Sequence, residues 1–432
     1  MNKLGVALAA ALLLSAGCTG QSGNGSSPTT LTYWASNQGS SLDNDRQVLQ
    51  PELDEFAKQT GITVKLEVVP WPDLLNRILA AATSGQGPDV INIGNTWAAS
   101  LQATGAFAPF DDSALNGLGG AQRFLAGSLA ATGAAGQTRT SVPLYGLAYG
   151  LFYNKKLFRE AGIGQPPTTW EEFTADAKRL THGDQWGLAV EGSSITENAH
   201  HAFILGQQYG SDLFDASGKP QFDTPQQVAA VRQYLEFMGT DKVVNPSNAE
   251  YGNGTQALHD LATGKAGMVL WQGNAETVLK ANGMRPEDYG IAPMPFPQPT
   301  PAGGKHINSL VAGINLAVFA NSGNKDGAMR FVKFLTSAEE QRKLNKSFGT
   351  LPVVQDAYQD PVFQTPAIKS FQQVLAGSAA PLPQIAQESQ FETTVGGAIK
   401  DLFAQIAGGK PVGDAEIKAA LSAAQQKMAT GG

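Results

Sequence analysis

The chain has 432 residues, 37 of them acidic and 30 basic, for a formal net charge of −7 at neutral pH. A net negative charge argues against nucleic acid and anionic membrane surfaces as partners. The chain contains a single cysteine, so no disulfide can form within it and its stability has to come from core burial. Charged residues make up only 16% and glycines number 49, which is typical of a compact α/β protein with many tight turns.

The N-terminus is typical of an exported protein. Lys3 precedes an apolar run over residues 4–14, and three small residues lie directly before Cys18. This run is too short to span a bilayer and suits a secretory signal peptide. The Leu-Ser-Ala-Gly-Cys sequence resembles a bacterial lipobox, and the alternative is a chance free cysteine beside an ordinary signal. We expect a signal peptide over residues 1–17, a lipid anchor on Cys18 and a flexible tether over residues 18–30.

Strand and helix patterns alternate after the tether. Apolar runs with period two or continuous burial predict strands, and apolar residues three and four apart predict helices. The predicted elements are a strand at Leu31–Trp34, a helix at Ser41–Gln59, a strand at Ile62–Val69, a helix at Trp71–Gly85 and a strand at Pro88–Gly94. This order predicts a parallel, doubly wound sheet with space for a ligand beyond the strand ends.

Later segments contain clear helix starts and one conspicuous loop. Ser/Thr-x-x-Glu/Gln sequences predict helix caps at Thr169, Thr224 and Ser337. We therefore assign the acidic pairs in two of these sequences, Glu171/Glu172 and Glu339/Glu340, to capping and not to catalysis. The proline-rich residues 295–304 predict a surface excursion, after which residues 309–319 resume a strand pattern.

No motif in the sequence supports a metal site or a catalytic centre. The five histidines form no HExxH, HxH or Cys/His cluster. Glu197 and His200 have a spacing that presents both on one helical face, but hydrogen bonding is the preferred interpretation of a single pair. Gly-x-Ser-x-Gly, a P-loop lysine and a dinucleotide fingerprint are all missing. We expect no catalytic residue, no metal and no cofactor.

Tryptophans give the most informative pattern. Four of them lie near predicted strand or helix ends, where open α/β sheets form their crevices: Trp34, Trp71, Trp97 and Trp271. A flat apolar ring suits one face of a pyranose, whose hydroxyls need paired donors and acceptors. Such polar partners stand beside two rings, Asn95 and Thr96 next to Trp97, and Gln272 and Asn274 next to Trp271. For each ring a packing role is the alternative, and we assign Trp170 and Trp186 to packing.

Six ordered blocks of the chain resemble the extracellular solute-binding proteins of sugar ABC importers, the group that includes maltose-binding protein. The blocks are residues 56–110, 142–180, 264–274, 288–297, 310–344 and 349–353, with Tyr-Asn-Lys at 153–155 and Pro-Thr-Thr-Trp-Glu-Glu-Phe at 167–173. Each block alone is a weak match, but six in the right order are specific. The C-terminal segment matches less distinctively.

This resemblance implies two doubly wound α/β lobes joined by three crossing segments, with a ligand cleft between them. The implied lobes are residues 31–146 plus 295–314, and residues 147–294 plus 315–432. The implied crossings lie near residues 146–149, 291–295 and 311–316. Glycine absorbs changes of φ and ψ at low steric cost, so the expected hinge residues are Gly146, Gly290 and Gly313.

The resemblance also implies a set of ligand-binding residues in the loops that match the family. The set is Asn37, Gln38, Asn95, Thr96, Trp97, Tyr149, Glu197, Trp271, Gln272, Asn274, Asn308 and Ser309. One departure concerns Ala275, because many relatives have a stacking tryptophan nearby. Trp271 then either replaces that ring from a shifted position or leaves stacking on this side weaker.

The function implied is that of a monomeric, lipid-anchored binding protein outside the cytoplasm, which captures a sugar and delivers it to an ABC transporter permease. The matched loops look most like those of binders of oligosaccharides, including chitobiose and xylo-oligosaccharide types. One alternative is the same fold with a non-sugar solute, such as a glycerophosphodiester, a polyamine or chelated iron. A secreted glycoside hydrolase is the third hypothesis, and it requires two carboxylates facing each other across a cleft.

Overall fold

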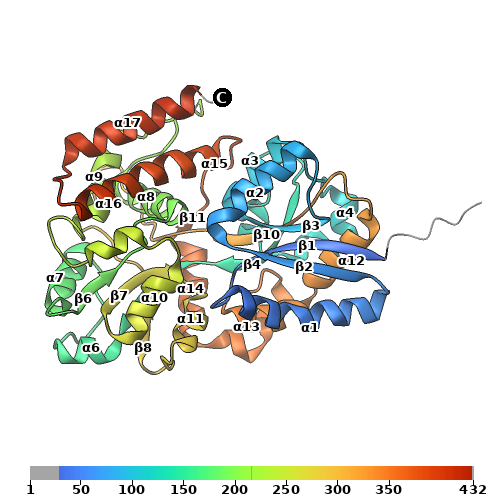
Figure 1. Ribbon diagram of the computed structural model, residues 1–432, viewed down its shortest axis with the longest axis horizontal. Helices are drawn as coiled ribbons and strands as arrows, with labels where there is room; N and C mark the ends of the chain where they lie inside the picture. Colours follow the sequence, from blue (N-terminus) through green and yellow to red (C-terminus); the bar gives the residue numbers. More distant parts are fainter. Residues whose placement is uncertain (1–28, 216, 431–432) are drawn as a thin grey trace, which may run out of the picture.

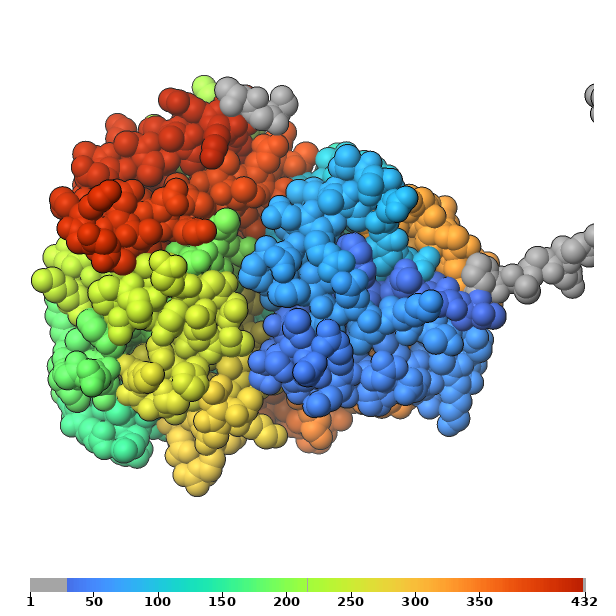
Figure 2. Space-filling view, viewed as in Figure 1, coloured from blue at the N-terminus to red at the C-terminus, as the bar shows by residue number. Residues whose placement is uncertain are grey.

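The computed structural model describes residues 29–215 and 217–430. The predicted signal peptide over residues 1–17, Cys18 and most of the tether lie outside these described residues. The described chain forms two α/β lobes side by side, each built on its own sheet, which confirms the predicted fold class (Figure 1). The surfaces of the two lobes meet along their junction on the face shown in Figure 2. Within the described residues, no helix is both long enough and apolar enough to cross a membrane.

The first lobe has a five-stranded sheet in the order β2-β1-β3-β10-β4. Its strands are β1 (Thr30–Ser36), β2 (Thr63–Val69), β3 (Val90–Gly94), β4 (Ser141–Leu147) and β10 (Ala312–Val318). Strand β1 is parallel to β2 and β3, as the alternating pattern predicts. Strand β10 is antiparallel to β3 and β4, so the sheet is mixed. The loops that follow β1 and β3 come out at the same edge of this sheet.

Helices cover both faces of this first sheet. They are α1 (Leu42–Thr60), α2 (Trp71–Ser84), α3 (Ala98–Ala103), α4 (Asp112–Gly117), α5 (Ala126–Ala130), α12 (Lys325–Leu335) and α13 (Ala338–Phe348), with short turns η1 (Asn95–Trp97) and η2 (Ala121–Arg123). Ser41 caps α1 by accepting from the amide of Asn44. Both α1 and α2 end at a glycine in the left-handed region, Gly61 with φ 74° and Gly85 with φ 68°.

The second lobe has a four-stranded sheet in the order β6-β7-β5-β8. Its strands are β5 (Tyr149–Asn154), β6 (Trp186–Ala189), β7 (Ala266–Gln272) and β8 (Tyr289–Ala292). Its helices are α6 (Lys155–Glu160), α7 (Trp170–Leu180), α8 (Ile195–Tyr209), α9 (Pro225–Glu236), α10 (Gly254–Thr263), α11 (Ala275–Ala281), α14 (Pro366–Gly377), α15 (Glu388–Phe391), α16 (Gly397–Ala407) and α17 (Asp414–Thr430). Short turns of this lobe are η3 (Pro246–Glu250), η5 (Pro361–Gln364) and the π-helical η6 (Glu392–Gly396), whereas η4 (Gln355–Gln359) packs against α13 of the first lobe. The C-terminal helices α16 and α17 pack beside α9 in one large core (Figure 1).

All three predicted helix caps are present. Thr169 and Glu172 form a reciprocal capping box at the start of α7. Thr224 accepts from the amide of Gln227, and Ser337 accepts from the amide of Glu340. The acidic residues beside these caps therefore serve the first turns of their helices, as predicted.

Two expected lobe boundaries are wrong. Residues 295–309 lie against the second lobe, because Gln208 donates to the carbonyls of Pro295 and Ile307 at 3.0 and 2.9 Å. Strand β10 and helices α12 and α13 belong to the first lobe, where Phe331 and Leu344 enter the core under the first sheet. The first lobe thus includes residues that we expected in the second, at least from 315 to 348. The boundary at residue 315 is wrong because β10 pairs with β3 and β4, which are far from it in sequence.

Three chain segments connect the lobes. The first passes from β4 to β5 at Ala148, and the second passes from β9 (Ser309–Leu310) to β10. The third runs from η4 of the first lobe to α14 of the second, and Leu351, shortly before η4, exchanges two backbone hydrogen bonds of 2.8 Å with Gly146. The expected crossing at residues 291–295 is therefore wrong.

The three connecting segments lie side by side at the predicted hinge. Gly313 pairs with Gly146 across β10 and β4. A Cβ atom on Gly313 would lie 2.6 Å from the carbonyl oxygen of Tyr145, so this approach of two strands requires glycine. Gly290, by contrast, lies within β8, paired with Tyr153 and away from any crossing.

Candidate functional site

Four polar side chains meet at the point where the chain enters the second lobe. Tyr149, the first residue of β5, donates its hydroxyl hydrogen bond to Glu197 at 2.5 Å, and His200 Nδ1 lies 2.8 Å from the same hydroxyl. Gln272, opposite Tyr149 on β7, places Nε2 2.9 Å from that hydroxyl and 3.3 Å from Glu197 Oε1. All four side chains are buried. Their positions are set by two strands and by the first turns of α8.

The hydrogen bonds of this network fix how many protons it holds. Tyr149 has one proton, and a second imidazole contact runs from His200 Nε2 to Glu392 Oε1 at 3.3 Å. Either Tyr149 donates to an ionised Glu197 and His200 carries both ring protons, or Glu197 is protonated and Tyr149 donates to His200. Glu197 and His200 together are neutral in both arrangements. Burial disfavours the imidazolium, but the hydrogen bond and charge of Glu392 outweigh it and raise the pKa of His200.

Glu392 joins the two lobes. Its Oε2 accepts from Trp97 Nε1 of the first lobe at 2.6 Å, while its Oε1 faces His200 of the second. Burial acts to raise the pKa of Glu392, but hydrogen bonds from His200, Thr96 and Trp97 lower it below its usual value. This carboxylate is therefore ionised and shared between the lobes at neutral pH.

Two weaker contacts cross the same junction. The amide of Ser389 on α15 donates to Ser100 Oγ on α3 at 2.9 Å. Asn274, at the start of α11, places Nδ2 3.5 Å from the carbonyl of Gln38 in the first lobe. In addition, Asn95 donates to the carbonyl of Val311 on the second crossing at 2.7 Å. Most of the predicted site residues thus gather where the lobes meet.

The first-lobe side of the junction is held rigidly by the start of α1. Asp45 accepts from the amides of Gln38 and Gly39, both at 2.9 Å, and from the side chain of Asn37. Trp71 donates to the carbonyl of Asn37 at 2.6 Å. The ring of Trp71 meets that of Trp97 edge to face, with centroids 5.6 Å apart. These contacts place two aromatic rings and the loop after β1 together.

Asn308 and Ser309 have a different position from the other predicted residues. Asn308 donates to the carbonyl of Met294 at 3.1 Å and accepts from Ser378 at 2.7 Å. Ser309 Oγ accepts from the amide of Tyr149 at 2.9 Å and donates to the carbonyl of Leu310. Their polar atoms are engaged within the protein, so both residues brace the second crossing.

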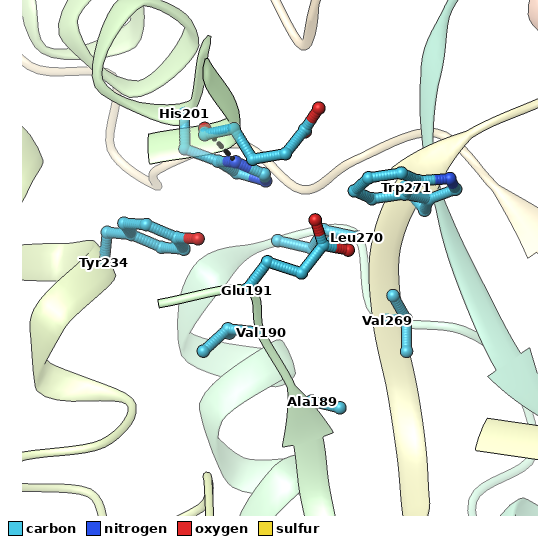
Figure 3. Close-up of a pocket in the computed structure, with 9 residues that line it drawn as sticks. Ala189, Val190, Glu191, His201, Tyr234, Val269, Leu270 and Trp271 are labelled. Carbon is cyan, nitrogen blue, oxygen red and sulfur yellow. Dashed lines mark hydrogen bonds between the residues drawn. The ribbon is translucent and has the colours of Figure 1, made fainter. Parts of the chain in front are cut away.

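A small recess opens beside the Tyr149 network in the second lobe (Figure 3). Its lining residues are Ala189, Val190, Glu191, Glu197, His201, Tyr234, Val269, Leu270 and Trp271. Trp271 forms one wall of the recess, at the end of β7. The Trp271 ring is held in place by Gly254, where any side chain would collide with it. Among the described residues, no group of three or more His, Cys, Asp or Glu side chains is arranged to hold a metal ion.

Comparison with known families agrees with this geometry. Residues 39–342 match the family model described as bacterial extracellular solute-binding protein. The protein belongs to this family. A putative binding protein of Brucella abortus is 28% identical over 301 residues, which are 69% of this chain and 70% of that protein. The diacetylchitobiose binding protein DasA of Streptomyces coelicolor is 28% identical over 336 residues, covering 75% of this chain and 73% of that protein.

Solved structures of solute-binding proteins share the fold. A solute-binding protein from Thermotoga lettingae bound to α-D-tagatose aligns with a TM-score of 0.81 at 20% identity, covering 93% of this chain and 100% of that one. The maltotriose-binding protein of Thermus thermophilus, bound to maltotriose, aligns with a TM-score of 0.75 at 21% identity, covering 93% and 99%. Sugar-binding solute-binding proteins of ABC transporters are thus its structural neighbours, and these family members and neighbours are described as binding proteins.

Sequence reasoning missed several buried polar residues of this solute-binding protein's junction and recess. They are Glu191, His201, Tyr234, Glu388 and Glu392. Glu388 and Glu392 lie four residues apart in the C-terminal segment, where the resemblance is least distinct. Two acidic residues at helical spacing beside apolar Phe391 and Val395 were the available signal.

Proposed function

We propose that this protein captures a di- or oligosaccharide between its two lobes outside the cytoplasm and delivers it to an ABC transporter permease. The observation that carries the proposal is the meeting of aromatic rings and buried hydrogen-bonding groups at the lobe junction, in a chain of the solute-binding family. A ligand bridging both sides stabilises the closed arrangement by its additional contacts. The closed form then docks on the permease, and the protein acts as a monomer with no bond of the ligand changed.

Sugar is favoured over the other cargoes by the chemistry of the junction. Relatives in the same family include glycerol-3-phosphate-binding proteins of Rhizobium meliloti and Agrobacterium fabrum, each matching at 26% identity or less. A phosphate ligand calls for Arg or Lys in the site. No lysine or arginine is among the described residues that line the recess. Tryptophan, tyrosine and amide side chains suit hydroxyl-rich rings instead.

The proposal is tested by a thermal-shift screen of the mature protein against mono-, di- and oligosaccharides, with amino acids, polyamines and glycerol phosphates alongside. A ligand at about 100 times its Kd stabilises the native state by about 2.7 kcal/mol, so a bound sugar raises Tm by several degrees. Stabilisation by the non-sugar compounds alone would overturn the sugar assignment. A reducing-sugar assay on the same glycans is expected to show no release of product, and release would make the protein a hydrolase.

Trp271 provides the sharper test of the site. We expect Trp271→Ala to weaken binding of the best sugar by about thirtyfold, the cost typical of a truncated aromatic anchor. Trp186→Phe, at the start of β6, is the matched control, because we assign that ring to packing. Equal affinity in the wild type and in Trp271→Ala would place the site elsewhere.

The lipid anchor is tested separately from sugar binding. We expect the wild type to sediment with membranes and Cys18→Ala to leave them while binding the same sugar with the same affinity. Continued membrane association of the Cys18→Ala variant would contradict the anchor.

A further inference from the structure

Glu191 is a buried carboxylate with no partner. It lies two residues beyond β6 and is 3% exposed, and neither of its carboxylate oxygens has a hydrogen-bond partner within the protein. Its backbone is fixed, because the amide of Val190 donates to Asn248 Oδ1 at 3.0 Å and the amide of Ser194 donates to the Glu191 carbonyl at 2.9 Å. Figure 3 shows its carboxylate pointing into the recess between His201 and Trp271. Such a group costs free energy unless something donates to it.

His201 presents a second bare acceptor to the same recess. Its Nδ1 lies 2.8 Å from the carbonyl oxygen of Glu197, so Nδ1 carries the proton and Nε2 carries a lone pair. Nε2 is buried and has no hydrogen-bond partner. Burial lowers the pKa of His201 to about 4, so the ring is neutral at pH 7. The recess therefore offers three bare acceptors, two oxygens of Glu191 and this nitrogen.

The walls of the recess have the character of a cation site. Glu191 and Glu197 both line it, and no lysine or arginine is among its described lining residues. Burial and the charge of Glu197 raise the pKa of Glu191, and a cation bound beside its carboxylate favours the ionised form. Trp271 and Tyr234 add aromatic rings, which attract cations through their negative faces.

We propose that this recess binds a protonated amino group carried by one unit of the sugar ligand. An ammonium group has three donors and no acceptor, which matches the three bare acceptors, whereas a hydroxyl donates once and brings its own lone pairs. The recess has room for about one water-sized group, far less than a pocket that holds a whole ligand. It therefore takes one substituent such as the amino group, and the remainder of the sugar extends toward Tyr149 and Trp97.

This inference rests on the proposed function, and its test uses three β-1,4-linked disaccharides that differ at carbon 2. Cellobiose carries a hydroxyl there, chitobiose a protonated amine, and N,N′-diacetylchitobiose a neutral acetamide. Putrescine is an amine without a sugar. Calorimetric titration of the full mature chain at pH 7 is expected to show that chitobiose binds about tenfold more tightly than cellobiose, because hydrogen bonds to charged groups are the stronger ones.

Glu191→Gln assigns the preference to the recess. The variant keeps the size of the side chain, removes its charge and replaces one acceptor by a donor. We expect it to lose the tenfold preference for chitobiose over cellobiose. Glu340→Gln, which neutralises a buried carboxyl of the first lobe, is the matched control and is expected to keep that preference.

Each outcome separates the inference from the proposed function. Cellobiose binding as tightly as chitobiose, or an amine preference that survives in Glu191→Gln, overturns the ammonium site and leaves sugar binding in place. Binding of putrescine without any of the disaccharides overturns the sugar function and retains the ammonium site. Binding of none of the four compounds overturns the ammonium site, and the sugar function is then decided by the thermal-shift screen.

Discussion

At the scale of single residues, the pKa values of two adjacent histidines on α8 are shifted in opposite directions. His200 faces Glu392 and Glu197, and these carboxylates raise its pKa despite its burial. His201 stacks on Tyr234 with ring centroids 4.7 Å apart, and burial lowers its pKa to about 4. Because protonation is linked to folding, the two rings contribute to stability with opposite dependence on pH.

We predict that His200→Gln destabilises the protein most at acidic pH. A histidine whose folded pKa is raised stabilises the native state fully below its unfolded value of about 6.5, and that contribution disappears as pH rises through the folded value. The loss should be about 3 kcal/mol at pH 5.5, the cost of breaking a buried pair, and smaller at pH 8.5. Urea unfolding of wild type and variant at both pH values measures it.

His201→Gln is the control with the opposite sign. The folded pKa of His201 is lowered, so the unfolded chain binds an extra proton between about pH 6.5 and 4, and the wild type loses stability as pH falls through that window. Replacing His201 removes this acid penalty. A loss from His200→Gln that is equal at pH 5.5 and 8.5 would contradict the charged pairing of His200 with Glu392.

At the scale of elements, sequence patterns predict the bounds of those strands and helices that local interactions determine. Strands β1 and β2 and helices α1 and α2 lie within a residue or two of their predicted bounds, because apolar period and glycine caps are short-range signals. The antiparallel insertion of β10 between β3 and β4 joins segments about 170 to 220 residues apart, so no local pattern encodes it. That single pairing accounts for the wrong boundary at residue 315.

The candidate site divides in the same way. Trp97, Tyr149 and Gln272 are predicted ligand contacts because they belong to blocks that match the family, whereas Glu392 lies in a π-helical turn of the less distinctive C-terminal segment. Its role depends on the approach of Trp97, 295 residues away. Asn308 and Ser309 were predicted as ligand contacts, but local bonding to the second crossing engages them. Packing, and not the residue type, decides between these roles.

The capping box of α7 gives a prediction at this scale. Thr169 and Glu172 satisfy each other's backbone amides, whereas Thr224 at α9 provides a side-chain cap to Gln227. We expect Thr169→Ala to lower the free energy of unfolding by about 1 kcal/mol and to leave sugar affinity unchanged. Thermal unfolding and calorimetric titration measure the two effects. Thr224→Ala, which removes a side-chain cap, is the matched comparison. A larger loss of unfolding free energy in Thr224→Ala than in Thr169→Ala would contradict a stabilising contribution from the reciprocal bond at α7.

At the scale of the whole molecule, one carboxylate hydrogen-bonds to both lobes, and three chain segments connect them. The connecting segments lie side by side near Gly146, Gly313 and Leu351. Glu392 lies at the junction itself, 1% exposed, with Trp97 of the first lobe and His200 of the second as its partners. This carboxylate therefore holds one group of each lobe at the same time.

We predict that Glu392→Gln shifts the ligand-free protein toward an open arrangement. Glutamine replaces one carboxylate oxygen by an NH₂ donor, so it cannot place an acceptor both at Oε2, which faces Trp97, and at Oε1, which faces His200. Small-angle X-ray scattering of the ligand-free variant should give a larger radius of gyration than the wild type, and saturating sugar should restore the wild-type value. Affinity should fall in proportion to the lost closed population, because the apparent Kd rises as the competent fraction decreases.

Ser389→Ala is the matched control, since Ser389 contributes its backbone amide to Ser100 and not its side chain. An unchanged radius of gyration in Glu392→Gln, together with wild-type affinity, would show that other contacts hold the lobes together.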